Sequence, residues 1–163
     1  MKKTLRLLSG LILNLIVASL VACTSEKDNG VSEFYDLGEE GMIPQKEYVF
    51  NPLDSIFGLQ AGDLSDIELA VRFSDQFSLQ SLPLTIEFGD LKNESIFRKE
   101  IDLLLYGNDD RHLGKGTLGI YESEFPLGSF HLEEGFFISV STPELSTRGI
   151  HAIGLLYKPV QKY

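Results

Sequence analysis

The stretch DIELAVRF (residues 66–73) alternates large apolar side chains with smaller or charged ones, and SLPLTIEF (residues 81–88) repeats the pattern. Alternation with a period of two is typical of a β-strand that buries one face and exposes the other. The large apolar positions are Ile67, Leu69, Val71 and Phe73 in the first stretch and Leu82, Leu84, Ile86 and Phe88 in the second. Pro83 cannot donate a ladder hydrogen bond, so we expect its strand to start there or to lie at a sheet edge.

Further short strands are expected along the rest of the chain. They are KEYVF (46–50), IFRKEIDLLLY (96–106), TLGIY (117–121), GSFHL (128–132), GFFISVS (135–141) and HAIGLLY (151–157). In 96–106 the expected inner face holds Phe97, Lys99, Ile101, Leu103 and Leu105. Glycine-, proline- and asparagine-containing turns separate the strands, including FPLG (125–128). Seven or eight such strands predict an all-β fold, a single antiparallel β-sandwich domain over residues 34–163, with a small barrel as the alternative.

Composition limits the partners and chemistry available to this domain. The 163 residues carry a formal net charge of −10 and 43% hydrophobic residues, which suits one domain with a real core. Because an acidic surface repels phosphate, no nucleic-acid partner is expected. The single cysteine, Cys23, excludes an internal disulfide. No cofactor is predicted.

The N-terminus has the features of a bacterial export signal. Lys2, Lys3 and Arg6 precede a mostly apolar run over residues 7–22, which is shorter than the roughly 20 residues of a spanning helix. The boundary Leu20-Val21-Ala22-Cys23 resembles the lipobox of lipoproteins. The resemblance implies a signal peptide over 1–22, cleavage between Ala22 and Cys23, and a lipid on the Cys23 sulfur. An uncleaved membrane helix with an incidental cysteine is the alternative.

Lipidation would decide where the protein works. The polar segment 23–33 is then a lipidated cysteine followed by a flexible tether. The mature chain loses three positive charges and has a net charge near −13. Cys23 becomes a thioether, which excludes thiol catalysis and metal binding by it. We expect a cell-envelope protein, anchored in the outer membrane with its domain on the periplasmic or the surface face.

Candidate sites for chemistry are few, and no metal site is predicted. The three histidines, His112, His131 and His151, lie in no metal-ligand spacing. The segment 114–117 (GKGT) lacks the first glycine of a phosphate loop and precedes a strand, so nucleotide binding is excluded. Asn108, Asp109 and Asp110 could offer oxygens to calcium, but a polar turn explains them as well.

A short match to an acceptor motif is also present. Asp54-Ser55-Ile56 resembles the short O-glycosylation acceptor of exported Bacteroidetes proteins. The match predicts glycosylation of Ser55, which the intact mass of the native protein would test.

The order of elements resembles the gliding-motility lipoprotein H (GldH) family of Bacteroidetes. The similarity spans residues 34–157, and its best motif is a glycine hairpin with its exit strand, carrying Gly114, Gly116, Gly119 and Tyr121. The chain departs from the family in two places. His112 or Leu113 stands where a tryptophan is frequent, and Thr142-Pro143-Glu144 replaces a Met-Arg pair. The departures imply a divergent member.

Three classes of function follow. The resemblance implies a non-enzymatic accessory or structural component of the gliding-motility apparatus or its associated secretion machinery, with envelope lipoproteins or motility and secretion proteins as partners. A surface glycan-binding module is the alternative, with Tyr106, Tyr121 and Tyr157 as candidate stacking residues. An envelope enzyme is the third class, and it is the weakest because no sequence motif pairs a nucleophile with a base.

Overall fold

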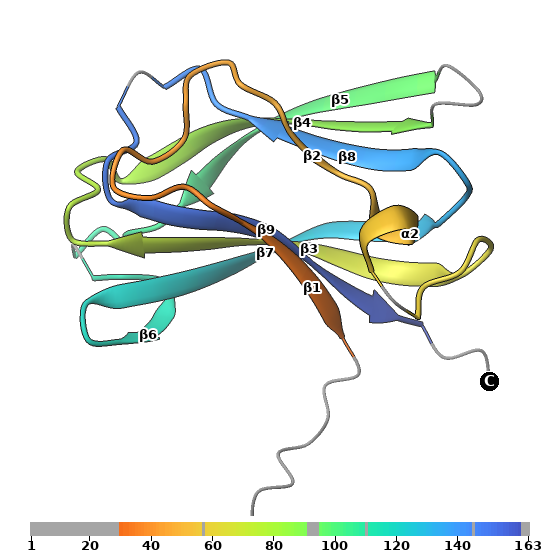
Figure 1. Ribbon diagram of the computed structural model, residues 1–163. Helices are drawn as coiled ribbons and strands as arrows, with labels where there is room; N and C mark the ends of the chain where they lie inside the picture. The colour runs from red at the N-terminus through yellow and green to blue at the C-terminus, as the bar shows by residue number, and fades with distance from the viewer. Residues whose placement is uncertain (1–29, 57, 91–94, 110, 145, 161–163) are drawn as a thin grey trace, which may run out of the picture.

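The protein is a β-sandwich of two antiparallel sheets, which confirms the predicted fold class (Figure 1). The computed structural model describes residues 30–56, 58–90, 95–109, 111–144 and 146–160. The predicted signal peptide, Cys23 and most of the tether lie outside these residues. No helix in the described part of the chain is long and apolar enough to cross a membrane.

The first sheet has five strands in the order β1-β9-β3-β7-β6. Their bounds are β1 (Val31–Asp36), β3 (Leu64–Ser74), β6 (Lys115–Thr117), β7 (Ile120–His131) and β9 (Ile150–Pro159). The second sheet has four strands in the order β2-β8-β4-β5. They are β2 (Tyr48–Phe50), β4 (Ser81–Asp90), β5 (Ser95–Leu104) and β8 (Phe136–Ser141). One turn of helix, α2 (Pro52–Ser55), follows β2.

The period-two pattern explains the core between the sheets. All eight of the large apolar positions that the sequence assigned to the inner faces of residues 66–73 and 81–88 are buried. They meet side chains of the other strands, among them Phe50, Ile138 and Tyr157, which are fully buried. Burial of this apolar surface is the main force that holds the two sheets together.

Two predicted boundaries in the second half of the chain are wrong. Residues 117–121 are not a strand, because Leu118 and Gly119 form the two-residue turn between β6 and β7 with φ of 58° and 80°. Residues 125–128 are not a turn but lie inside β7, which pairs with β3 along its length and contains a bulge near Gly128. Pro126 is tolerated because β6 pairs only with residues 120–122, so β7 has an open edge there.

The structure also corrects the predicted start of two strands and the predicted burial of one side chain. β1 begins at Val31 and pairs with β9, so it includes three residues, 31–33, that the sequence placed in the tether. β4 begins at Ser81, ahead of Pro83, and its pairing with β8 starts only at Thr85. In β5 the expected inner face is buried at Leu103 but 64% exposed at Phe97.

The sandwich has two distinct ends. We call the tether end the one where β1 and β5 begin and β4, β7 and β9 finish, because the chain enters the domain there (Figure 1). We call the opposite end the pocket end. It carries the loops that follow β3, β5 and β8, and the hairpin between β6 and β7.

Candidate functional site

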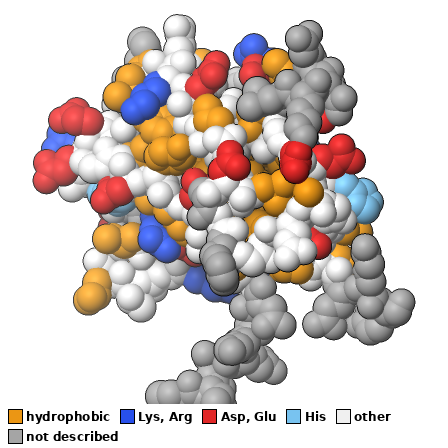
Figure 2. Space-filling model, turned by 45° about the vertical axis from the view of Figure 1, so that its right-hand side comes forward, with side chains coloured by type: hydrophobic (Ala, Val, Ile, Leu, Met, Phe, Trp, Pro, Cys, Tyr) orange, Lys and Arg blue, Asp and Glu red, His pale blue; other side chains and the backbone are white. Residues whose placement is uncertain are grey.

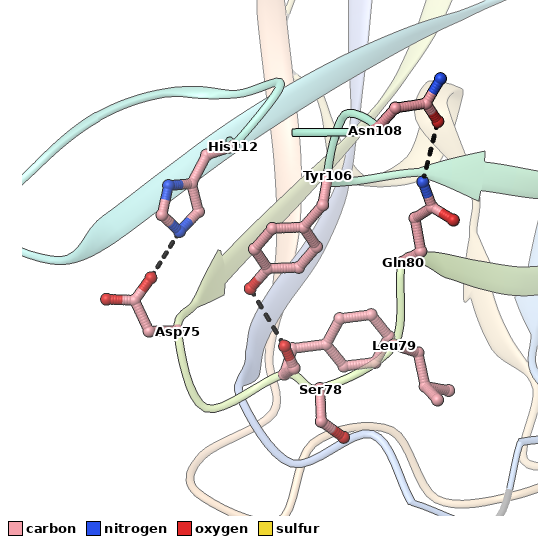
Figure 3. A pocket seen from close by; sticks show the side chains of 8 residues that line it. Asp75, Ser78, Leu79, Gln80, Tyr106, Asn108 and His112 are labelled. Atoms are coloured by element: carbon pink, nitrogen blue, oxygen red, sulfur yellow. Dashed lines mark hydrogen bonds and ion pairs between the residues drawn. The ribbon is translucent and has the colours of Figure 1, made fainter. Parts of the chain in front are cut away.

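An open pocket of about 520 Å³ lies at the pocket end. The loop between β3 and β4 contributes Asp75, Ser78, Leu79 and Gln80, and the segment after β5 contributes Tyr106, Asn108 and His112 (Figure 3). Volumes of this size are usual for small-molecule sites, although this one is open to solvent and mostly polar.

Backbone hydrogen bonds fix the two segments that form the pocket. The Phe77 amide donates to the Ser74 carbonyl at 3.0 Å, which closes the loop, and the Phe77 side chain is buried beneath it. The amides of Leu105 and Tyr106 both donate to the Gln80 carbonyl, at 3.0 and 3.2 Å. The segment after β5 is therefore tied directly to the start of β4.

Gly149 supports the loop from behind. The Ser74 amide donates to the Gly149 carbonyl at 2.8 Å. Gly149 has a φ of +91°, and a Cβ added to it would lie 2.2 Å from the Phe77 amide nitrogen. The approach of these two backbones therefore requires a glycine at this position.

His112 occupies one wall of the pocket. Its Nε2 is hydrogen-bonded to the Asp75 carboxylate, and its ring stacks on Tyr121 with centroids 3.5 Å apart and an interplanar angle of 11°. The side chain of His112 is 22% exposed, whereas that of Asp75 is 71% exposed. The stack and the hydrogen bond together hold the imidazole in one orientation.

Tyr106 forms the floor beside His112. Its hydroxyl donates a hydrogen bond shared by the carbonyls of Phe77 and Ser74, at 3.0 and 3.1 Å. Burial raises the pKa of Tyr106, and the nearby Asp75 charge raises it further, so the hydroxyl stays protonated. The hydroxyl therefore serves the fold, while the ring is the part that lines the pocket.

Gln80 and Asn108 face each other across the rim, where the Gln80 amide donates to the Asn108 side-chain oxygen at 3.4 Å (Figure 3). Asp109, the next residue, is engaged locally, since its carboxylate contacts the backbone amide of Arg111 at 3.4 Å and its guanidinium at 3.1 Å. Asp110 lies outside the described residues. Within the described residues, His, Cys, Asp and Glu side chains form no group of three that could hold a metal ion.

The hairpin between β6 and β7 places Tyr121 next to His112, and its close backbone contacts require glycines. A Cβ on Gly116 would lie 2.1 Å from the Ile120 carbonyl oxygen, and one on Gly114 would lie 2.6 Å from that of Glu122. These close approaches let β6 fold back on β7, which presents Tyr121 to His112. Gly119 supplies the positive φ of the turn.

Other predicted residues lie elsewhere. Tyr157, a proposed sugar-stacking residue, is fully buried in the core, so that prediction is wrong. Tyr157 pairs with the buried Ile67 of β3 and shares its inner face, whereas its neighbours Leu156 and Lys158, which point to the other face, are only partly buried. His151 Nε2 contacts the Ser74 hydroxyl at 2.9 Å, and His131 is exposed where β7 ends. Ala22, Cys23 and the Ser55 side chain lie outside the described residues.

The sequence did not single out Asp75 or Gln80. Both stand in a short polar loop between two strong strands, where such residues are ordinary turn formers. What sets them apart from other turn residues is seen only in the fold. Asp75 is hydrogen-bonded to His112, 37 positions away in the chain, and Gln80 to Asn108, 28 positions away. A local sequence signal could not have identified the pair.

The site is better suited to binding than to covalent chemistry. It presents a carboxylate, two amides and an imidazole around an aromatic floor, with Leu79 at the rim. His112 already uses Nε2 for Asp75, and the Ser78 side chain points away from it (Figure 3). The arrangement can therefore accept and donate hydrogen bonds, but it does not align a hydroxyl with a base.

No family model matches the chain, and no curated protein matches it. Among solved structures, the coat protein of Tobacco streak virus in its dimer form is similar over 85% of this chain and 92% of its own, with 11% identity and a TM-score of 0.32. A second form of that protein covers 86% and 93% at 11% identity and a TM-score of 0.31. Similarity this low supports no inference about function.

Proposed function

We propose that the protein is a non-enzymatic lipoprotein of the bacterial cell envelope, an accessory or structural component of the gliding-motility apparatus or its associated secretion machinery. The observation that carries the proposal is the position of the lipobox cysteine, because Cys23 precedes the first strand, which begins at Val31, by only eight residues. Fully extended, such a tether spans at most about 29 Å.

The two ends of the domain support a role in binding. The tether enters at one end, while the pocket and the exposed side chains of Leu79, Leu113 and Leu118 lie at the other. Anchored through Cys23, the domain would offer the pocket end to other proteins. The motility or secretion assignment itself rests on the resemblance of residues 34–157 to the family named above.

Metabolic labelling with palmitate tests the anchor. The wild-type protein should incorporate label and a Cys23→Ala variant should not. Equal labelling of the two would refute the lipoprotein assignment.

Deletion of the gene tests the proposed role in the gliding or secretion apparatus. In a host that both glides and secretes through the associated machinery, we expect reduced colony spreading or reduced secretion of cargo proteins. Complementation with the wild-type gene should restore both, whereas the Cys23→Ala gene should not. Unchanged spreading and secretion after deletion would count against this part of the proposal.

Glycan binding is the second candidate, and the lining of the pocket favours it. Side-chain amides and carboxylates beside an aromatic ring can bond to sugar hydroxyls while the ring packs against the sugar face, and Gln80, Asn108, Asp75 and Tyr106 provide this set. A glycan array with the wild-type protein and an Asn108→Ala variant tests it. Binding that Asn108→Ala removes would support the candidate, and no binding above background would dismiss it.

A further inference from the structure

Two large apolar side chains are exposed at the start of β5. Ile96 and Phe97 are each 64% exposed, and they are followed directly by the exposed basic residues Arg98 and Lys99. Arg98 is partly neutralised, since its guanidinium lies 3.7 and 3.6 Å from carboxylates of Glu87 and Glu100. Apolar residues flanked by long basic side chains are typical of segments at a membrane–water interface.

This apolar pair lies at the tether end. Ser95 pairs with Asp90, and Asp90 also pairs with Phe136, where β8 begins. In the other sheet, Val31 pairs with Tyr157 near the end of β9. Figure 1 shows the start of β5 and the start of β1 toward the same end of the sandwich. Figure 2 turns this side forward and shows apolar side chains gathered among acidic ones.

Packed aromatic rings support Phe97 from within. The ring of Phe97 lies 6.1 Å from that of Phe88, which is 7% exposed. Phe88 in turn stacks on Phe130 of the other sheet at 4.8 Å, and Phe130 contacts Phe136 at 5.9 Å. Phe97 is therefore the outermost ring of a cluster that joins both sheets, and its register opposite Phe88 is fixed by the β4–β5 ladder.

The tether limits how far this end can move from the lipid. Cys23 is at most about 29 Å from Val31, whereas the 11 residues of β3 extend the sandwich by about 36 Å along its strands. An anchored domain that lies with its tether end toward the membrane brings Phe97 to the lipid surface. The pocket end then lies at least a strand length away from that surface.

We propose that Ile96 and Phe97 insert into the interface of the membrane that holds the Cys23 lipid, and that they orient the domain with its pocket end away from the bilayer. The inference rests on the lipid anchor proposed above and adds a second membrane contact to it. The occupant is zwitterionic lipid, because the mature chain, with a net charge near −13, is repelled by an anionic surface.

The absence of tryptophan from the chain makes the test direct. A Phe97→Trp variant carries a single indole, and Leu118→Trp places the same reporter at the pocket end, where Leu118 is fully exposed. Both mature lipoproteins are reconstituted into vesicles of phosphatidylethanolamine and phosphatidylcholine, with and without brominated phosphatidylcholine. Brominated chains quench an indole that lies within the bilayer.

We expect the emission of the Phe97→Trp protein to shift to the blue and to fall at least two-fold with brominated lipid, while that of Leu118→Trp stays unchanged. Equal emission of Phe97→Trp in the two lipids would overturn the inference. If Phe97→Trp does not fold, Ile96→Trp replaces it with the same expectations. Because an indole itself favours the interface, wild-type protein should also show slower amide exchange at residues 96–99 in vesicles than in detergent.

Three further outcomes separate this inference from the lipid anchor itself and from a protein-binding surface. Failure of the wild-type protein to float with vesicles refutes the lipid anchor, and with it the premise. Flotation with an unquenched Phe97→Trp refutes only the insertion. Shielding of the indole from acrylamide in native envelopes, but not in pure lipid, would assign the surface to a protein and overturn the inference.

Discussion

The tether end and the pocket end of this sandwich are built by different interactions. At the tether end, rings from both sheets pack from Phe130 through Phe88 to the exposed Phe97. At the pocket end, polar side chains and loop backbones bond to one another, as Asp75 does to His112 and Ser74 does to Gly149. Hydrogen bonds are directional, so they hold the loops around the pocket in one conformation. Ring packing is not directional in this way, and at the tether end it leaves an apolar ring exposed. Four sets of substitutions can break or sharpen this comparison.

The largest effect is expected at Gly149. Gly149→Ala places a methyl group against the Phe77 amide at a positive φ, so we expect a loss of about 3 kcal/mol or more in the free energy of unfolding. Gly119→Ala is the matched control, because its φ is +80° but nothing lies within 4 Å of the added Cβ. It should cost about 1 kcal/mol. Equal losses in urea denaturation would show that backbone strain, and not the contact with the loop, sets the cost.

The second comparison lies within the aromatic cluster. Phe88→Ala removes a ring that is 7% exposed and joins the two sheets, and should destabilise the protein by about 3 kcal/mol. Phe97→Ala removes one that is 64% exposed and should cost about 0.5 kcal/mol. Denaturant midpoints of the two variants measure the difference. A cost for Phe97→Ala as large as that for Phe88→Ala would mean that Phe97 serves folding and not an interface.

The third test concerns His112, which forms one wall of the pocket. His112→Ala removes both the stack on Tyr121 and the bond to Asp75, and should cost about 1.5 kcal/mol. His112→Phe keeps a ring against Tyr121 and should recover about half of that loss. Chemical denaturation and the near-ultraviolet circular dichroism of the tyrosines measure both. No recovery in His112→Phe would assign the stability to the hydrogen bond alone.

The fourth test concerns Tyr157, where the expected effect has the opposite sign. Its hydroxyl is buried without a hydrogen-bond partner in the described part of the chain, so Tyr157→Phe should stabilise the protein by about 1 kcal/mol at neutral pH. A destabilised variant would indicate that the hydroxyl has a partner, such as a buried water.

The same substitution has a pH dependence. Burial, and secondarily the charge of Glu33, raises the pKa of Tyr157 far above the usual value of 10.0. The folded protein therefore keeps a proton that the unfolded chain loses, and wild-type stability falls as the pH rises above 10. Tyr157→Phe should lose less stability between pH 9 and 11. Parallel slopes for the two proteins would contradict this assignment.

Sequence patterns predicted the strands whose alternation was strict. The inner faces of β3 and β4 follow from their side chains alone, because every second residue must leave water. The pattern failed where tertiary contacts changed the local signal. Pro126 and Gly128 predicted a turn, but β7 continues through both residues because it pairs with β3 there, with one bulge. Phe97 was predicted to be a core residue, but β5 is the edge strand of its sheet and Phe97 is 64% exposed.

The candidate site was predictable only in parts. Tyr106, Asn108, His112 and the hairpin glycines drew attention in the sequence, but as unrelated features. Their partners Asp75 and Gln80 come from a loop on another strand pair, and no local pattern links the two segments. Long-range pairing brings them together, and sequence spacing does not report it.

By itself, the sequence determined the strand alternation, the acidic charge and the single cysteine at the end of a short apolar run, because each of these is a property of the composition or of neighbouring residues. The tertiary structure decided which loops meet at the pocket and that Tyr157 belongs to the core. It also decided that Phe97 stays exposed at the end where the chain enters. These outcomes depend on which strands pair and which strand lies at a sheet edge, and contacts between residues distant in sequence set both.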